Sequence, residues 1–230
     1  MAKTKVSRKE LLKEPDTVLT FSRRLFAFAY ANRVQLLSGL GVLLALTLIV
    51  SGVQFYGERQ EKRAFDGLRS GREQYQEALR DGAPAEAYQA VRSHFESLIS
   101  EYGNKDGGKL ARLVFADMAL EADDFDAAAA LYQEALADFG EESSLRNQAL
   151  SGLAYAHEGK GEPEAAVEHF ERIVAGNGAY LKSDALFQLG RLYEEQGQME
   201  KSTETYERLL EEFPDFVYAD LVQERLGRRS

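Results

Sequence analysis

One stretch of the sequence, from Val34 to Tyr56, contains no charged side chain over 23 residues. As an α-helix it would be about 34 Å long at ~1.5 Å per residue, enough to cross the ~30 Å hydrocarbon core of a bilayer. A lone β-strand would leave its backbone N–H and C=O groups unsatisfied in lipid. The stretch therefore predicts a single transmembrane helix over residues 34–56, which fits its length better than a buried core helix does.

The charge of the chain changes sign across this stretch. Residues 1–33 hold eight Lys and Arg against three Asp and Glu, whereas the residues after Tyr56 hold 20 basic and 35 acidic side chains. Lys and Arg near one end of a membrane helix favour the cytoplasmic side. The pattern predicts a cytoplasmic N-terminus and an external acidic domain, residues 57–230. An acidic domain also argues against nucleic acid as a partner, because phosphate binding needs clustered Lys and Arg.

Residues 1–33 are predicted to form a basic cytoplasmic tail. Its charge favours attraction to anionic lipid headgroups, and the alternative is a short docking helix over residues 7–14. Residues 16–32 combine arginines with aromatic side chains, a mixture typical of an amphipathic helix at the membrane interface. The residues that carry this prediction are Phe21, Arg23, Arg24, Phe26, Phe28 and Tyr30.

A cleaved signal peptide is the competing interpretation of the same region. Signal peptides have a short basic segment and an apolar segment of about 7–15 residues that ends in small side chains. Here the basic leader is 33 residues long and the apolar stretch has 23. These lengths favour an uncleaved anchor. The chain has no cysteine, so it forms no disulfide.

A spaced pattern near the C-terminus predicts the fold of the domain. Within the segment from Ser183 to Pro214, apolar, small and aromatic residues recur at Leu186, Leu189, Gly190, Tyr193, Gly197, Ser202 and Tyr206. The order resembles the tetratricopeptide repeat, W-x-x-L-G-x-x-Y followed by A-x-x-x-F and a closing Pro. In this chain Leu186 replaces the Trp, Ser202 the Ala and Tyr206 the Phe.

The same frame occurs twice more upstream. Gly161, Ala166 and Phe170 each lie 36 residues before their counterparts, and Tyr132 lies 38 residues before Phe170. The resemblance implies an all-α solenoid of helical hairpins that follows a single transmembrane helix. Its repeats are predicted at residues 109–140, 147–178 and 183–214, with a degenerate first hairpin at 60–103 and a capping helix at 216–228.

The recurring residue types have a packing rationale. Two antiparallel helices approach closely when small side chains face one another, and each helix pair leaves an apolar face that a neighbour must cover. We expect aromatic side chains to fill the gap to the next pair. The predicted small residues are Ala116, Ala154 and Gly190 opposite Ala128, Ala166 and Ser202, and the predicted aromatic residues are Tyr132, Phe170 and Tyr206.

A stack of such pairs presents a concave surface formed by the first helix of each pair. We predict that this surface binds an extended peptide or a partner helix. The predicted lining residues are Leu113, Asp117, Ser151, Tyr155, Phe187 and Arg191. The alternative is that Leu113 and Phe187 belong to the core and that Asp117 and Arg191 are only solvated, since apolar positions at helical spacing are usually core.

Enzyme motifs are missing from the sequence. His94, His157 and His169 have no matching cysteines and no H-E-x-x-H spacing, which makes a metal site improbable. The sequence also lacks G-x-S-x-G, the P-loop pattern and G-x-G-x-x-G. We therefore predict a protein-binding scaffold without cofactor, metal or catalytic residues.

The plan as a whole, with a basic tail, one span and an external acidic repeat domain, is similar to the YfgM-like family of ancillary SecYEG translocon subunits. That resemblance implies a single-pass protein of the bacterial inner membrane with a periplasmic domain. It would act as a scaffold or chaperone-like adaptor that holds translocon subunits and passes emerging chains to periplasmic chaperones. The alternative is a coordinator of cell-envelope assembly or division, resembling the periplasmic tetratricopeptide proteins of the Tol–Pal system.

Overall fold

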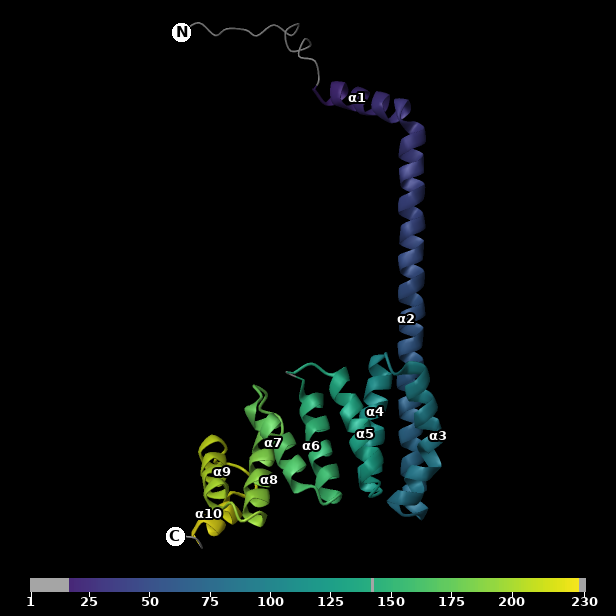
Figure 1. The fold of residues 1–230 in the computed structure, drawn as a ribbon. Coiled ribbons are helices and arrows are strands. Elements are labelled where there is room, and N and C mark those ends of the chain that lie inside the picture. The colour runs from purple at the N-terminus through teal and green to yellow at the C-terminus, as the bar shows by residue number, and fades with distance from the viewer. Residues whose placement is uncertain (1–16, 142, 228–230) are drawn as a thin grey trace, which may run out of the picture. The chain divides into compact units, whose positions relative to one another are not determined.

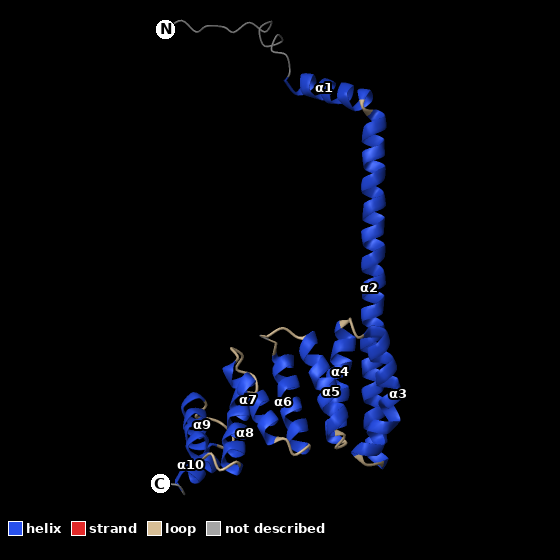
Figure 2. Cartoon of the chain, in the orientation of Figure 1, coloured by secondary structure: helices blue, strands red, loops and turns tan. Residues whose placement is uncertain are grey.

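The computed structural model describes residues 17–141 and 143–227, and the secondary structure in these ranges is helical with no strands (Figure 2). The predicted all-α class is confirmed. Residues 1–16 of the predicted tail lie outside the described residues. The chain divides into two compact units, residues 1–58 and 59–230, and each is described by itself.

The first unit consists of helix α1 (Thr17–Ala31) and the start of helix α2 (Arg33–Asp81). Every residue from 34 to 56 has an exposed side chain. Within the described residues, α2 is the one helix long and apolar enough to cross a membrane. A contiguous apolar surface of this extent is rare on soluble monomers and is typical of a surface that meets lipid or another protein. Apolar side chains of α1 are also exposed, at Leu25, Phe26, Phe28 and Tyr30.

The second unit is a row of helices in which each helix packs against the next along the chain (Figure 1). The row begins with residues 59–81 of α2 and α3 (Pro84–Tyr102). It continues through three antiparallel pairs and ends with a short helix. These are α4 (Asp106–Glu121), α5 (Phe125–Asp138), α6 (Ser144–Gly159), α7 (Pro163–Ala175), α8 (Lys182–Glu195), α9 (Met199–Glu212) and α10 (Ala219–Gly227).

Small residues bring the two helices of each pair together, as predicted. Ala116, Ala128, Ala154 and Ala166 have no exposed surface. In the last pair the Ser202 hydroxyl donates to the Gly190 carbonyl oxygen at 2.7 Å. The serine therefore satisfies its buried hydroxyl without widening the helix contact.

The predicted aromatic positions are buried but do not all bridge to the next pair. Tyr132 of α5 packs on Gly152 of α6, the next pair along, where a Cβ atom would overlap the ring. Tyr206 of α9 packs on Gly190 of its own pair, and the Phe170 ring of α7 lies 5.5 Å from Tyr155 of its own pair, measured between centroids. Glycine is needed at positions 152 and 190 because the ring occupies the place of a side chain.

The turn within each of the three pairs contains one residue in the left-handed backbone conformation. Gly161 and Gly197 adopt φ of +73° and +72°, and Asp123 takes the same left-handed conformation at φ 59° in the first pair. Asp tolerates this region better than most residues with a Cβ. The next residue, Asp124, caps α5 by accepting a hydrogen bond from the Ala127 N–H at 3.2 Å.

The predicted capping helix is shorter than expected. α9 ends at Glu212, just before Pro214, which cannot continue a helix, and after the turns at residues 213–218 α10 starts at Ala219. Val222 is fully buried, whereas its neighbour Leu221 is 39% exposed. Arg225 of α10 pairs with Glu194 of α8 at 2.8 Å. Residues 228–230 lie outside the described residues.

Candidate partner-binding face

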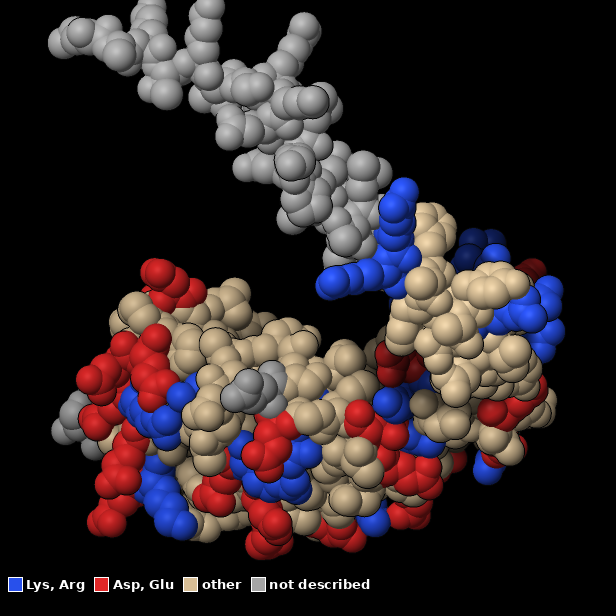
Figure 3. Space-filling model, turned by 90° about the horizontal axis from the view of Figure 1, so that it is seen from above, with Lys and Arg blue, Asp and Glu red and all other residues tan. Residues whose placement is uncertain are grey.

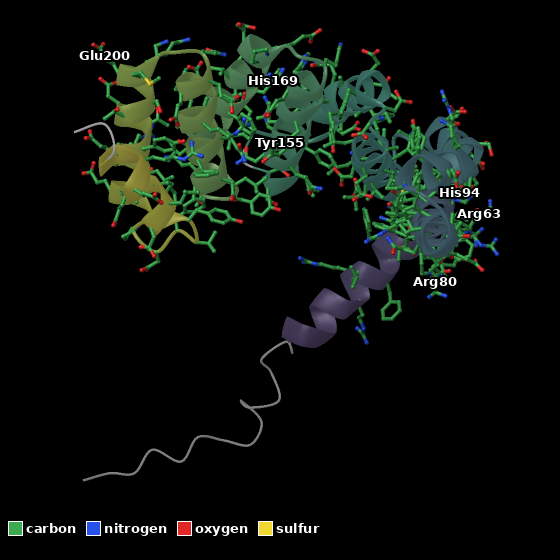
Figure 4. The ribbon with its side chains drawn as sticks, turned by 90° about the horizontal axis from the view of Figure 1, so that it is seen from below. Arg63, Arg80, His94, Tyr155, His169 and Glu200 are labelled. Atoms are coloured by element: carbon green, nitrogen blue, oxygen red, sulfur yellow. The ribbon has the colours of Figure 1, made fainter. Side chains whose placement is uncertain are left out.

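The first helices of the pairs form a common surface in the second unit. We call the surface formed by α4, α6, α8 and residues 59–81 of α2 the inner face. Tyr155 of α6 lies on this side of the row in Figure 4. Five of the six predicted groove residues are partly buried at the inner face: Asp117, Ser151, Tyr155, Phe187 and Arg191. Leu113 is only 2% exposed, so the structure assigns it to the core and to the floor of the surface.

A hollow of about 350 Å³ opens on the inner face where α2, α4 and α6 meet. Its floor is apolar and its rim carries charged and amide side chains, a combination typical of sites that bind part of a ligand or partner. The lining residues are Arg72, Tyr75 and Gln76 of α2, Leu110, Leu113, Val114, Asp117, Met118 and Glu121 of α4, and Leu145 and Gln148 of α6.

Asp117 is the central polar group of this hollow. Its carboxylate accepts hydrogen bonds from the Tyr132 hydroxyl at 2.6 Å and from Gln148 Nε2 at 3.0 Å. Burial raises the pKa of Asp117, and these two hydrogen bonds oppose that rise by favouring the charged form. Asp117 thereby ties α4 to the helices on either side, α5 and α6.

A second hydrogen bond between side chains links α2 to α4. The Tyr75 hydroxyl donates to Glu121 Oε2 at 2.8 Å. Burial and the neighbouring carboxylate both raise the pKa of Tyr75, so the phenol remains a neutral donor at physiological pH. The carboxylates of Asp117 and Glu121 are therefore already engaged by the protein's own donors.

Between α6 and α8 the inner face carries a charged network. Gln188 Nε2 donates to the Tyr155 hydroxyl oxygen at 3.1 Å. Arg191 donates to both oxygens of Glu158, at 2.7 and 2.8 Å, and to Glu195 at 2.8 Å. Arg191 is thus not freely solvated, and a partner could bind it only by breaking its ion pairs with Glu158 and Glu195.

Aromatic side chains dominate the α8 end of the inner face. The Phe187 ring lies 5.7 Å from Phe216 and 5.6 Å from Tyr218, measured between ring centroids, and 6.3 Å from Tyr206. Tyr218 is 52% exposed, so the cluster has an open edge. The sequence pattern missed Phe216 and Tyr218 as parts of this face because it placed them in a helix.

The inner face also depends on residues that the motif does not mark. Gln148, Glu158 and Gln188 make the contacts between neighbouring first helices, yet none of them belongs to the repeat pattern. A signal was present, because Gln148 lies three residues before Ser151 and Gln188 lies three residues before Arg191, a spacing that places each pair on the same side of its helix.

The histidines take structural positions. His157 and His169 stack with ring centroids 5.2 Å apart, and His157 Nδ1 lies 2.7 Å from Glu162. His94 Nε2 lies 2.8 Å from the Gly67 carbonyl oxygen. Over residues 17–141 and 143–227, no group of three His, Asp or Glu side chains could hold a metal ion.

The model of the tetratricopeptide repeat-like domain family matches residues 30–228. The chain belongs to this family. Tetratricopeptide-like repeats imply a scaffold for protein–protein interaction, and proteins of this type are typically not enzymes. The comparison with curated proteins found no match.

Two solved structures share the helical fold. The crystal structure of a putative kinesin light chain from Podosopora anserina with nearly identical TPR-like repeats has a TM-score of 0.55 at 16% identity, covering 73% of this chain and 85% of that one. The crystal structure of MamA protein has a TM-score of 0.52 at 17% identity, covering 70% and 84%. At these identities the likeness shows the fold alone.

Proposed function

We propose that this protein is a membrane-anchored adaptor that binds partner proteins through the inner face of its tetratricopeptide-like domain. The observation that carries the proposal is the combination of two surfaces in one chain. Residues 34–56 expose apolar side chains over a length that suits a bilayer, and the inner face offers an apolar-floored hollow with a polar rim.

We place the N-terminus in the cytoplasm and residues 57–230 in the periplasm of a bacterium. The excess of Lys and Arg before residue 34 supports this orientation. The similarity of the overall plan to the YfgM-like family supports a link to protein translocation, with translocon subunits, periplasmic chaperones or emerging secreted chains as partners. Anchoring would raise the local concentration of the inner face near such partners without any new contact.

Photocrosslinking in living cells tests the binding face. A photoreactive amino acid at Ser151 is the probe, because the Ser151 side chain lies at the inner face and makes no hydrogen bond in the structure. The matched control is the same amino acid at Gln133, which is exposed on α5, a second helix of its pair. We expect adducts with translocon subunits, chaperones or secreted chains at position 151 and few at 133.

Other outcomes of this experiment would change the proposal. Equal adducts at both positions, or none at Ser151, would contradict binding at the inner face. Adducts restricted to envelope-assembly or division proteins would replace the translocation role by the Tol–Pal type of role.

Cysteine labelling tests the topology without background, because the chain has no native cysteine. Ser22→Cys lies before the apolar stretch and Gln133→Cys lies after it. A membrane-impermeant maleimide should label position 133 in spheroplasts and position 22 only after the membrane is opened. Labelling of position 22 in intact spheroplasts would contradict the proposed orientation.

A further inference from the structure

The second-unit part of α2 carries a row of side chains that no other helix covers. We call Phe65, Arg69, Arg72, Gln76 and Arg80 the arginine strip. Their spacings of four, three, four and four residues place them on one side of the helix. An open hollow of about 620 Å³ follows the strip, and its lining residues within the described ranges belong to α2: Phe65, Leu68, Arg69, Arg72, Glu73, Gln76, Glu77 and Arg80.

The arginine strip lies at the N-terminal edge of the inner face. Arg72 and Gln76 line both this hollow and the one between α2, α4 and α6. The opposite side of α2 is occupied, because Leu98 of α3 packs at Gly67, and His94 and Phe95 pack at Gly71. Arg80 and Glu200 mark opposite ends of the second unit in Figure 4.

The charges of the strip differ from those of the remaining domain. Residues 57–81 hold six basic and six acidic side chains, whereas residues 82–230 hold 14 basic and 29 acidic ones. Figure 3 shows acidic side chains spread among basic ones over one face of the second unit. Arg69 pairs with Asp66 at 2.7 Å, and Arg72 lies close enough to Asp117 for its charge to lower the pKa of that carboxyl. Among the described residues neither Arg72 nor Arg80 makes an ion pair within 4.0 Å, although Glu73 and Glu77 line the same hollow.

Apolar surface accompanies these charges. Phe65 is 43% exposed at one end of the strip, and Leu68 lies at the edge of the core beside it. An apolar anchor with charged positions at helical spacing is the pattern that a groove or helix face uses to hold an amphipathic helix. Exposed arginines favour carboxylates, which they can bind with two parallel hydrogen bonds.

We infer that the arginine strip binds an acidic amphipathic helix of a partner protein. This inference rests on the proposed adaptor function and specifies the chemistry of the partner. An apolar side chain of the partner helix would pack against Phe65, and carboxylates at its flank would pair with Arg69, Arg72 and Arg80. A second copy of this chain fits less well, because two parallel α2 helices would place each arginine opposite its own counterpart.

The test uses the full chain in nanodiscs of zwitterionic lipid and two fluorescent helical peptides of about 18 residues. The peptides share one leucine face and differ only at the flanking positions, which carry Glu in one peptide and Lys in the other. At about 50 mM salt we expect the Glu peptide to bind about tenfold more tightly, because charge attraction is little screened there. The double variant Arg69→Glu, Arg72→Glu should reverse the preference.

The matched control is Arg92→Glu, Arg208→Glu, which makes the same charge change at two exposed arginines away from the strip. This control should keep the preference for the Glu peptide, and circular dichroism should show unchanged helicity in both double variants. The inference would be overturned if the two peptides bound equally well, or if the control variant changed the peptide preference as much as the strip variant does. Self-association of the protein through the strip would also overturn it. Persistent crosslinks from Ser151 alongside such a result would leave the adaptor function standing.

Discussion

The two ends of the tetratricopeptide-like domain differ in how far their surfaces are covered by the chain itself. At the C-terminal end, α10 places Val222 in the core, and Arg225 bonds to Glu194 and to the Tyr206 hydroxyl oxygen. At the N-terminal end, α2 covers α4 with Ala64 and Tyr75 but presents Phe65 and the arginine strip outward. A helical solenoid needs its last apolar face covered. The C-terminal end is thus covered by the chain itself, whereas the N-terminal end exposes the strip at which we propose that a partner binds.

The largest expected effect is at the covered end. Val222→Asp would bury an unpaired carboxylate, and we expect a loss of about 3 kcal/mol in the free energy of unfolding. The control is its neighbour, Leu221→Asp, which is 39% exposed in the wild type and should change the free energy by less than about 0.5 kcal/mol. Urea unfolding followed by circular dichroism measures both. Similar losses in the two variants would show that α10 does not cap the row.

The second-largest loss of stability is expected in the helix pairs between the two ends. Gly152→Ala places a methyl group where the Tyr132 ring lies, and both residues are buried. We expect overpacking to cost about 2 kcal/mol. Gly140→Ala is the control, since a Cβ atom there meets nothing within 4 Å. A variant at position 152 as stable as the control would contradict the close contact of α5 and α6.

The N-terminal end has its own stabilising contact. The Glu61 carboxylate of α2 accepts hydrogen bonds from the backbone N–H groups of Asp106 at 3.3 Å and Gly107 at 2.8 Å, at the start of α4. Glu61→Ala should cost about 1 kcal/mol, the usual effect of losing a helix cap. Glu58→Ala, one turn earlier on α2, should have no measurable effect. Equal stability of the two variants would argue against this link.

Acid should weaken the middle of the row rather than its C-terminal cap. Burial, together with nearby His157 and Arg172, lowers the pKa of His169 below its ordinary value, and Glu168 opposes this. As the pH falls below 6.5 the unfolded chain therefore binds a proton that the folded chain does not, and stability decreases. Between about pH 7.5 and 5.5 the wild type should lose more stability than His169→Asn, whereas identical pH profiles would exclude this role.

The smallest expected effect on stability is at the open end. Arg80→Glu changes an exposed side chain that makes no ion pair with the described residues, so the free energy of unfolding should stay within about 0.5 kcal/mol of the wild type. A larger loss would mean that the strip serves the fold, and the contrast between the two ends would then disappear.

The sequence predicted the fold well because the repeat pattern marks contacts between small and aromatic residues. Gly190 with Ser202, and Tyr132 against the next pair, follow directly from that pattern. The break at Pro214 was predicted, but the capping helix was predicted to start at Phe216 because helical periodicity continues through Phe216 and Ala219, whereas α10 starts at Ala219.

The candidate site was less predictable than the fold. The pattern selected helix positions on the inner face but could not distinguish buried Leu113 from partly exposed Phe187. It also gave no pairing for Arg191, since Glu158 lies 33 residues away in sequence on another helix. Which side chains engage each other across helices depends on the packing distance between α6 and α8, and a repeat pattern does not encode that distance.

The most direct test asks whether the arginine strip is covered in the native membrane. Gln76→Cys lies in the strip, and Glu200→Cys, exposed at the opposite end of the row, is the control. We predict that a maleimide labels position 76 slowly in native membranes and rapidly in the purified protein, while position 200 labels rapidly in both. Adding Arg72→Glu should abolish the protection. Equal labelling rates at position 76 in membranes and in purified protein would contradict the view that this end of the domain receives a partner.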